Sequence, residues 1–133
     1  MLAGQFRHEP VHPAVGFRVE TSDGIVAITG NTLVCDEVAA LAAGADVLVY
    51  EAMRFEKIRQ RPPHLHFILD YHADMSRIGA QAAELEVSTP VLTHLIPPPE
   101  SDDDIQAFVD DICSAGYGGG LVIAEDLAQV TLG

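Results

Sequence analysis

Four short runs of the chain are apolar at nearly every position, and this feature constrains the fold most. Their sequences are IVAI at 25–28, VLVY at 47–50, VLT at 91–93 and LVIA at 121–124. Strands that are apolar on both sides are typical of sheets buried on both faces. The chain therefore needs a layer of cover over each face of a central sheet.

Glycine and proline residues divide the rest of the chain into alternating strands and helices. Six strands are predicted, at Val15–Glu20, Gly24–Thr29, Asp46–Glu51, Pro90–Leu95, Leu121–Glu125 and Gln129–Leu132. The turn Thr-Ser-Asp-Gly joins the first two strands as an antiparallel hairpin, because Asp-Gly readily supplies a positive φ.

Three helices are predicted between the later strands. Asp36 caps the first, which stops at Gly44, and Asp74 caps the second, which runs through Leu85. The third begins at Ser101, which forms a capping-box-like pair with Asp104, and carries apolar residues at helical spacing.

These elements predict an α/β fold with one mixed sheet of about six strands backed by about three helices, in one domain of residues 1–133. Three helices cover one face comfortably. The second face requires either helices divided between the two sides, as in a doubly wound sheet, or a second sheet that this chain does not contain.

The net charge of −13 disfavours nucleic-acid and membrane-surface partners, since no basic stretch is evident. The apolar runs are too short to cross a bilayer, and the first residues lack a signal-peptide core. We therefore expect a soluble, cytoplasmic protein without a nucleic-acid or membrane partner. Cys35 and Cys113 are far apart, which argues against a disulfide framework.

Five segments, read in order, resemble the second half of a metallo-β-lactamase-fold hydrolase. The similarity is to the branch that contains arylsulfatase-like enzymes and the transfer RNA 3′-processing nuclease. The segments are HEPVHPAVGFRV from His8, ITGNT from Ile28, DVLVYEA from Asp46, HAD from His72 and LTHLIP from Leu92. The resemblance implies half of an αββα sandwich that places a two-metal site along one edge of two facing sheets.

The resemblance also implies roles for four residues. His8 and His94 stand where the family has metal ligands, and Asn31 stands where it has an aspartate that bridges two metals. His72 stands where some members have a histidine that assists proton transfer. The expected chemistry, where hydrolysis survives, is attack by a metal-activated water with His72 as proton donor to the leaving group.

Two departures from the family pattern put the activity in doubt. The HxHxDH motif, which holds most of the family's ligands, is absent, and the bridging carboxylate is the amide of Asn31. A catalytic zinc site needs three protein ligands and an open position, so His8 and His94 do not suffice alone. The sequence therefore predicts a homologue that is impaired or inactive by itself, with an incomplete site for zinc or another divalent metal.

Other polar residues admit alternatives. His64 and His66 would lie on one side of a strand as metal ligands do, although surface histidines are the commoner case. His12 is an alternative to His8 as the metal ligand. His94 could instead be a core histidine whose ring nitrogens are hydrogen-bonded, which is the commoner case for a histidine at the end of an apolar strand. Asn31 could equally be a turn residue.

Carboxylates and glycines elsewhere favour structural roles. Glu51 and Asp126 lie at the ends of strands, and we expect these carboxylates to pair with His72 or an arginine. Asp102–Asp104 are read as charges at a helix start, and the three glycines from Gly118 precede a strand, which excludes a phosphate-binding loop there.

Two functions stay open at this point. The first is a hydrolase homologue of an ester, phosphoester or sulfuric ester lineage with half of its site missing. The second is a non-catalytic scaffold in which two copies pair through the open sheet face and bury more than about 2,000 Å². A complementary N-terminal half-domain is the other partner that would cover that face.

Overall fold

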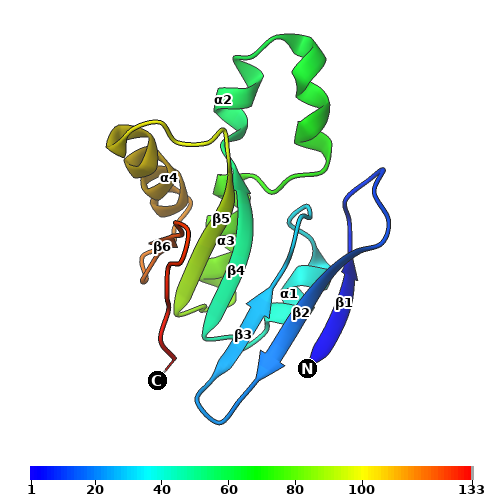
Figure 1. The fold of residues 1–133 in the computed structure, drawn as a ribbon, viewed down its shortest axis with the longest axis vertical. Coiled ribbons are helices and arrows are strands. Elements are labelled where there is room, and N and C mark those ends of the chain that lie inside the picture. The colour runs from blue at the N-terminus through cyan, green and yellow to red at the C-terminus, as the bar shows by residue number, and fades with distance from the viewer. Residues whose placement is uncertain (133) are drawn as a thin grey trace.

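A computed structural model describes residues 1–132 of the chain. The elements are β1 (Leu2–Phe6), β2 (Ala14–Glu20), β3 (Ile25–Ile28), α1 (Asp36–Ala42), β4 (Val47–Met53), α2 (Phe55–Arg59), the 3₁₀ helix η1 (Pro63–Asp70), α3 (Met75–Glu84), β5 (Thr89–Ile96), α4 (Asp102–Ser114) and β6 (Val122–Ile123). The strands form one six-stranded sheet in sequence order, as Figure 1 shows. The predicted mixed sheet is confirmed: β1, β2 and β3 pair antiparallel, and β3 to β6 pair parallel.

Helices α1, α3 and α4 all pack on one face of this sheet. Tyr50, Leu48 and Leu92 point into the core on that side, together with side chains of α1, α3 and α4 such as Val38, Ile78, Phe108 and Ile112. In Figure 1, α1 and α3 lie behind the strands. The doubly wound alternative, which needs helices on both faces, is therefore wrong.

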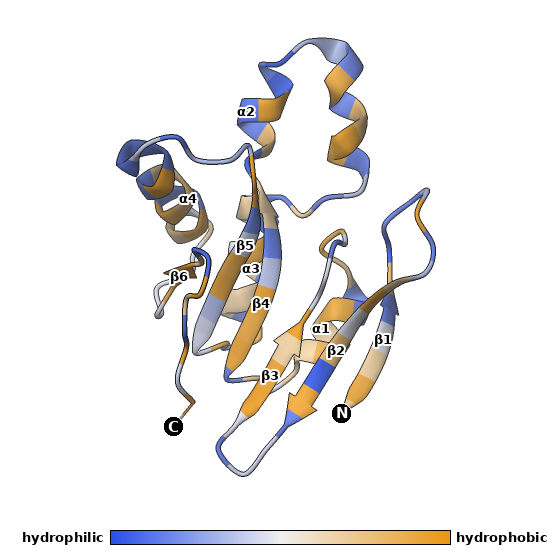
Figure 2. Cartoon of the chain, in the orientation of Figure 1, coloured by the Kyte–Doolittle hydropathy of each residue, from blue (hydrophilic) through white to orange (hydrophobic). Residues whose placement is uncertain are grey.

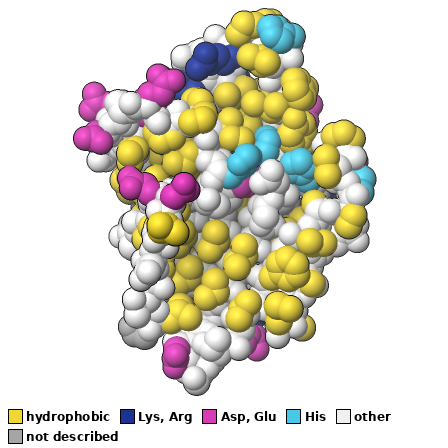
Figure 3. Space-filling view, viewed as in Figure 1, with side chains coloured by type: hydrophobic (Ala, Val, Ile, Leu, Met, Phe, Trp, Pro, Cys, Tyr) yellow, Lys and Arg dark blue, Asp and Glu magenta, His cyan; other side chains and the backbone are white. Residues whose placement is uncertain are grey.

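The opposite face, here called the open face, presents apolar side chains to solvent. Val15, Phe17 and Ile28 are 42%, 39% and 38% exposed. Figure 2 colours most of β3 and β4 as hydrophobic, and Figure 3 shows many hydrophobic side chains on this face. Val26 and Val49 belong to it as well, because they alternate with the core residues Ala27, Leu48 and Tyr50. Its strands are thus apolar on both sides, as expected, while the chain provides one full layer of cover.

The C-terminal segment crosses part of the open face. Ala128, Val130 and Leu132 line an apolar groove of about 270 Å³ together with valines of the sheet, which are Val26, Val47, Val49 and Val91. The strand predicted at Gln129–Leu132 is wrong, because this segment lies across the sheet and pairs with none of its strands.

The remaining differences from the predicted elements have physical reasons. Strand β1 was not predicted, because its sequence LAGQF has weak strand propensity, yet β2 supplies its ladder and Phe6 enters the core. Helix α2 and η1 were not predicted either, and both lie outside the sheet layer, where no long apolar period marks them. None of the helices in residues 1–132 has both the length and the apolar character needed to span a membrane.

The helix start at Ser101 is confirmed, and it supports a first prediction. The Ser101 hydroxyl accepts a hydrogen bond from the Asp104 N–H at 3.2 Å. The Glu100 N–H and the Ser101 hydroxyl both bond the Asp104 carboxylate and lower its pKa. Replacing Ser101 with alanine should lower the free energy of unfolding by about 1 kcal/mol, measured by urea denaturation. Ser114→Ala, at the other end of α4, is the matched control and should change it far less.

Candidate functional site

Three histidines from distant parts of the chain meet at one edge of the sheet. His8 follows β1, His72 precedes α3, and His94 lies within β5. The ring centroids of His8 and His72 are 5.5 Å apart, and those of His72 and His94 are 5.6 Å apart. Figure 3 shows histidine side chains gathered above the apolar open face. These three residues are called the histidine cluster below.

His94 is placed by an irregularity in its strand. Glu51 pairs with Thr93, whereas Ala52 pairs with Leu95, so His94 is the extra residue of a β-bulge. Its φ of +46° lies in the left-handed region, which a non-glycine residue rarely adopts. Bulges next to active sites re-aim a side chain, and backbone strain is often kept at functional positions. His94 is also exposed, so the core-histidine alternative is wrong.

The buried carboxylate of Glu51 holds the ring of His72 in place. Glu51 is 2% exposed, and its Oε1 lies 3.0 Å from His72 Nδ1 and 3.0 Å from the Ala73 N–H. The Met53 N–H also donates to the Ala73 carbonyl, which ties the His72 segment to the end of β4. The expected pairing of Glu51 with His72 is confirmed. Nε2 is the ring nitrogen of His72 that does not contact Glu51.

The ring of Tyr71 packs beside two rings of the histidine cluster. Its ring centroid lies 4.9 Å from that of His8 and 4.8 Å from that of His72. The sequence offered no signal for this residue, because the contact depends on how the segment after η1 folds back toward the loop after β1.

The two candidates near the N-terminus are separated by the fold. His8 is buried and belongs to the cluster, while His12 is half-exposed and pairs with Glu9 at 2.7 Å. Asn31 is exposed in the loop after β3. Its neighbour Thr32 is buried, and the Thr32 N–H lies 3.4 Å from Glu51 Oε1.

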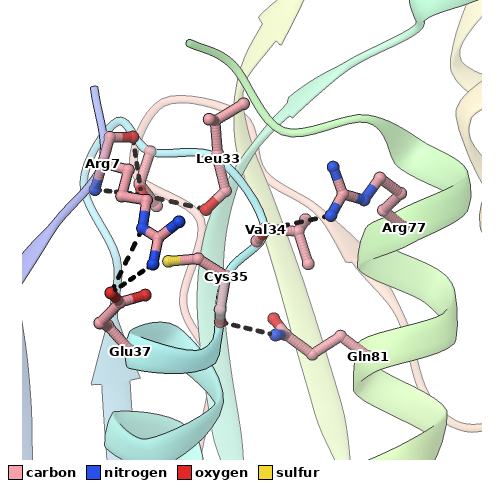
Figure 4. Close-up of polar contacts among 8 residues, drawn as sticks. Arg7, Leu33, Val34, Cys35, Glu37, Arg77 and Gln81 are labelled. Carbon is pink, nitrogen blue, oxygen red and sulfur yellow. Dashed lines mark hydrogen bonds and ion pairs between the residues drawn. The ribbon is translucent and has the colours of Figure 1, made fainter. Parts of the chain in front are cut away.

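A polar network fixes the loop that carries Asn31, as Figure 4 shows. Thr32 Oγ1 lies 3.3 Å from the Arg7 N–H and 3.1 Å from the Arg7 carbonyl, so it links this loop to the residue before His8. The Arg7 guanidinium donates to Glu37 Oε1 at 2.9 Å. The backbone N–H of Glu37 and this guanidinium hold the pKa of the Glu37 carboxyl at about 2. On the other side, Gln81 Nε2 donates to the Cys35 carbonyl at 3.1 Å.

The remaining candidates lie elsewhere. His64 and His66 belong to η1, a 3₁₀ helix, so the alternative in which both rings lie on one side of a strand is wrong. His66 Nε2 lies 2.8 Å from the Arg61 carbonyl, which is a structural contact. Asp126 is exposed in the turn after β6 and belongs to none of the strands.

The chain's own donors fit only part of a metal site. His8 Nε2 and Glu51 Oε2 are buried and have no hydrogen-bond partner within the described part of the chain. Both atoms have a lone pair that a ligand could use. Within residues 1–132, however, no three His, Cys, Asp or Glu side chains converge in a way that could hold a metal ion. Since a catalytic metal needs about three protein ligands, the side chains of residues 1–132 do not fit one by themselves.

Comparison with known sequences identifies relatives over most of the chain. No protein-family model matches. The ribonuclease Z of Mycobacterium tuberculosis (strain ATCC 25177 / H37Ra) is 33% identical over 126 residues, which are 92% of this chain and 45% of that protein. The ribonuclease Z of Mycobacterium sp. (strain KMS) is 38% identical over 92 residues, which are 68% of this chain and 32% of that protein. The chain spans about half the length of the curated relatives it matches.

Two solved structures superpose on most of this chain. The metallo-β-lactamase fold protein YhfI from Bacillus subtilis superposes with a TM-score of 0.68 at 20% identity, covering 91% of this chain and 45% of that one. A diphosphatase from the PhnP family superposes with a TM-score of 0.59 at 16% identity, covering 98% and 43%. The resemblance found in the sequence motifs is thereby confirmed. The chain shares its fold with these metallo-β-lactamase-fold proteins, and its sequence is similar to that of ribonuclease Z proteins over about half of their length.

Proposed function

We propose that the chain supplies one half of a hydrolase site and is impaired or inactive until a second sheet completes that site. His8 and His94 would contribute metal ligands, and His72 would move a proton to the leaving group. The observation that carries this proposal is the histidine cluster itself, which joins residues far apart in sequence at the edge of a sheet whose open face is only partly covered.

The geometry around His72 supports its role. Glu51 fixes the ring through Nδ1, so the imidazole keeps one orientation and offers Nε2 to a reacting group. The unpartnered Nε2 of His8 and Oε2 of Glu51 support a site that is finished by atoms from outside this half. The substrate would be an ester, a phosphoester or a sulfuric ester.

Metal analysis of the chain, purified without chelator, tests the proposal together with hydrolysis of p-nitrophenyl esters and bis-p-nitrophenyl phosphate. We expect less than one tightly bound zinc per chain and no turnover above that of the His72→Ala variant. Asn31→Asp should raise zinc affinity, because it adds a carboxylate beside Thr32, whose N–H contacts the Glu51 carboxylate that holds His72. Stoichiometric tight zinc with robust turnover that is lost in His8→Ala and His94→Ala would contradict the proposed impairment.

A second candidate function follows from the open face. Two copies that pack these faces together would rebuild a two-sheet sandwich and could serve as a scaffold without catalysis. The exposed Val15, Phe17 and Ile28 favour such an association. Light scattering of the purified chain tests this association.

A further inference from the structure

The segment after β6 forms a loose cover over part of the open face. Its residues Ala128, Val130 and Leu132 line an apolar groove of about 270 Å³ together with valines of β3, β4 and β5. These three residues alternate along the chain, so their side chains lie on one side of an extended segment. In Figure 1 the segment is the red stretch that runs down beside β5. Residues 127–132 are called the strap below.

The strap divides the open face into a covered part and an uncovered part. Val47 and Val91 line the groove under the strap and are 6% and 7% exposed, whereas Phe17 and Ile28 lie outside it and are more than one-third exposed. The pairing of β2 to β5 places all four side chains on the same face of the sheet. Since α1, α3 and α4 pack on the other face, the strap is the element that covers these two valines.

Few contacts hold the strap in place. Its only backbone hydrogen bond within residues 1–132 joins the Ala128 N–H to the Glu125 carbonyl, which closes a local turn. Val130 stays 37% exposed although it lines the groove. Leu127, where the strap begins, has a φ of +68° and is 95% exposed, so no packing offsets a backbone conformation that leucine rarely adopts. A segment with so few hydrogen bonds and buried contacts opens at a low cost in free energy.

The uncovered part of the open face is too small for a stable dimer. An interface of about 2,000 Å² takes roughly 1,000 Å² from each copy. Val15, Phe17 and Ile28 are each less than half exposed, and three such side chains supply only a fraction of that area. A second copy must therefore also use the valines that the strap covers.

We propose that the strap is a displaceable cover that competes with a second copy of the chain for the valines of β4 and β5. The closed strap keeps Val47 and Val91 from water and from a partner. When the strap opens, the apolar face becomes continuous from β2 to β5, and the sheet of the second copy takes the place of three side chains. This inference rests on the proposed self-association for what replaces the strap, whereas the cover itself does not depend on it.

The dye 8-anilinonaphthalene-1-sulfonate, which binds exposed apolar surface, tests the cover under dilute conditions that favour the monomer. The double variant Val130→Ser, Leu132→Ser loosens the strap and should raise the dye fluorescence at least about threefold, because the valines below become accessible. Gln129→Ser, Thr131→Ser changes two strap residues that do not line the groove and should leave the fluorescence as it is. A dye signal that is equal in the two variants would overturn the proposal.

Contacts between methyl groups in NMR spectra of the unaltered chain give a second test, which needs no variant. Nuclear Overhauser effects should join Leu132 or Val130 to Val47 or Val91 in the monomer and should disappear in the associated form. Their absence from the monomer, or their persistence in a dimer, would contradict a strap that closes and is displaced.

Light scattering over a range of concentrations tests the competition. Val130→Ser, Leu132→Ser should lower the dimer dissociation constant at least about fivefold, because a larger fraction of the chains is then open and competent to associate. Gln129→Ser, Thr131→Ser should leave the constant unchanged. A constant that stays equal or rises in the first variant would overturn the competition. A chain that is monomeric in every form, while the dye signal rises as expected, contradicts the proposed self-association and supports the strap as a displaceable cover.

Discussion

Replacing Glu51 with alanine should lower the free energy of unfolding by about 3 kcal/mol and release the His72 ring. The substitution leaves the Ala73 N–H without its acceptor in a buried place and removes the partner of His72 Nδ1. A buried donor left without a partner costs about 1–3 kcal/mol, and the lost packing of the side chain adds to this. Such a loss is a large part of the stability of an ordinary domain. Urea denaturation measures it.

Two variants show whether this loss comes from the buried contacts. Glu51→Gln keeps an oxygen for the Ala73 N–H and should cost about half as much or less. Glu84→Ala, on the exposed side of α3, removes an equal charge and should change the free energy of unfolding by less than about 0.5 kcal/mol. The imidazole nitrogen signals of His72 in NMR spectra should broaden or shift in Glu51→Ala and stay in Glu84→Ala. Unchanged signals would contradict the role of Glu51 in positioning that ring.

The elements of the core could be predicted from the sequence because local signals agreed with the tertiary structure. Ser101 and Asp104 mark the start of α4, and the turn at Asp23-Gly24 joins β2 to β3, as expected. Strand β1 and the segment 129–132 were predicted wrongly for one shared reason. Strand formation there depends on whether a neighbouring ladder is available, and the sequence of a single segment does not show its neighbours.

The motifs of the sequence predicted the three histidines of the candidate site, but not its other features. The family pattern named His8, His72 and His94, and the structure brings them together, yet Tyr71 belongs to no motif and enters through the path of the chain after η1. The bulge at His94 depends on the register between β4 and β5. Sequence spacing does not determine a register that is set by side-chain packing across two strands.

The open face leads to the prediction with the other largest effect. We expect the purified chain to form a homodimer in solution, with twice the mass of the 14.2 kDa chain, and to bury about 2,000 Å² or more. Phe17 and Ile28 are directly opposite each other on β2 and β3, and both are more than one-third exposed. The double variant Phe17→Lys, Ile28→Glu removes this apolar pair, keeps the net charge, and places opposite charges across the strands, which preserves the sheet.

This variant should raise the dimer dissociation constant about a hundredfold or more. Each large apolar side chain removed from a buried interface costs roughly 1.5–3 kcal/mol, and a symmetric dimer loses both chains' copies. The matched control is Ala40→Lys with Ala80→Glu, which places the same two charges on exposed positions of α1 and α3, the helix layer. Light scattering should give a monomer for the open-face variant and a dimer for the control. A wild-type chain that stays monomeric at micromolar concentration would exclude the second copy, and a complementary sheet would then be the partner that the exposed strands require.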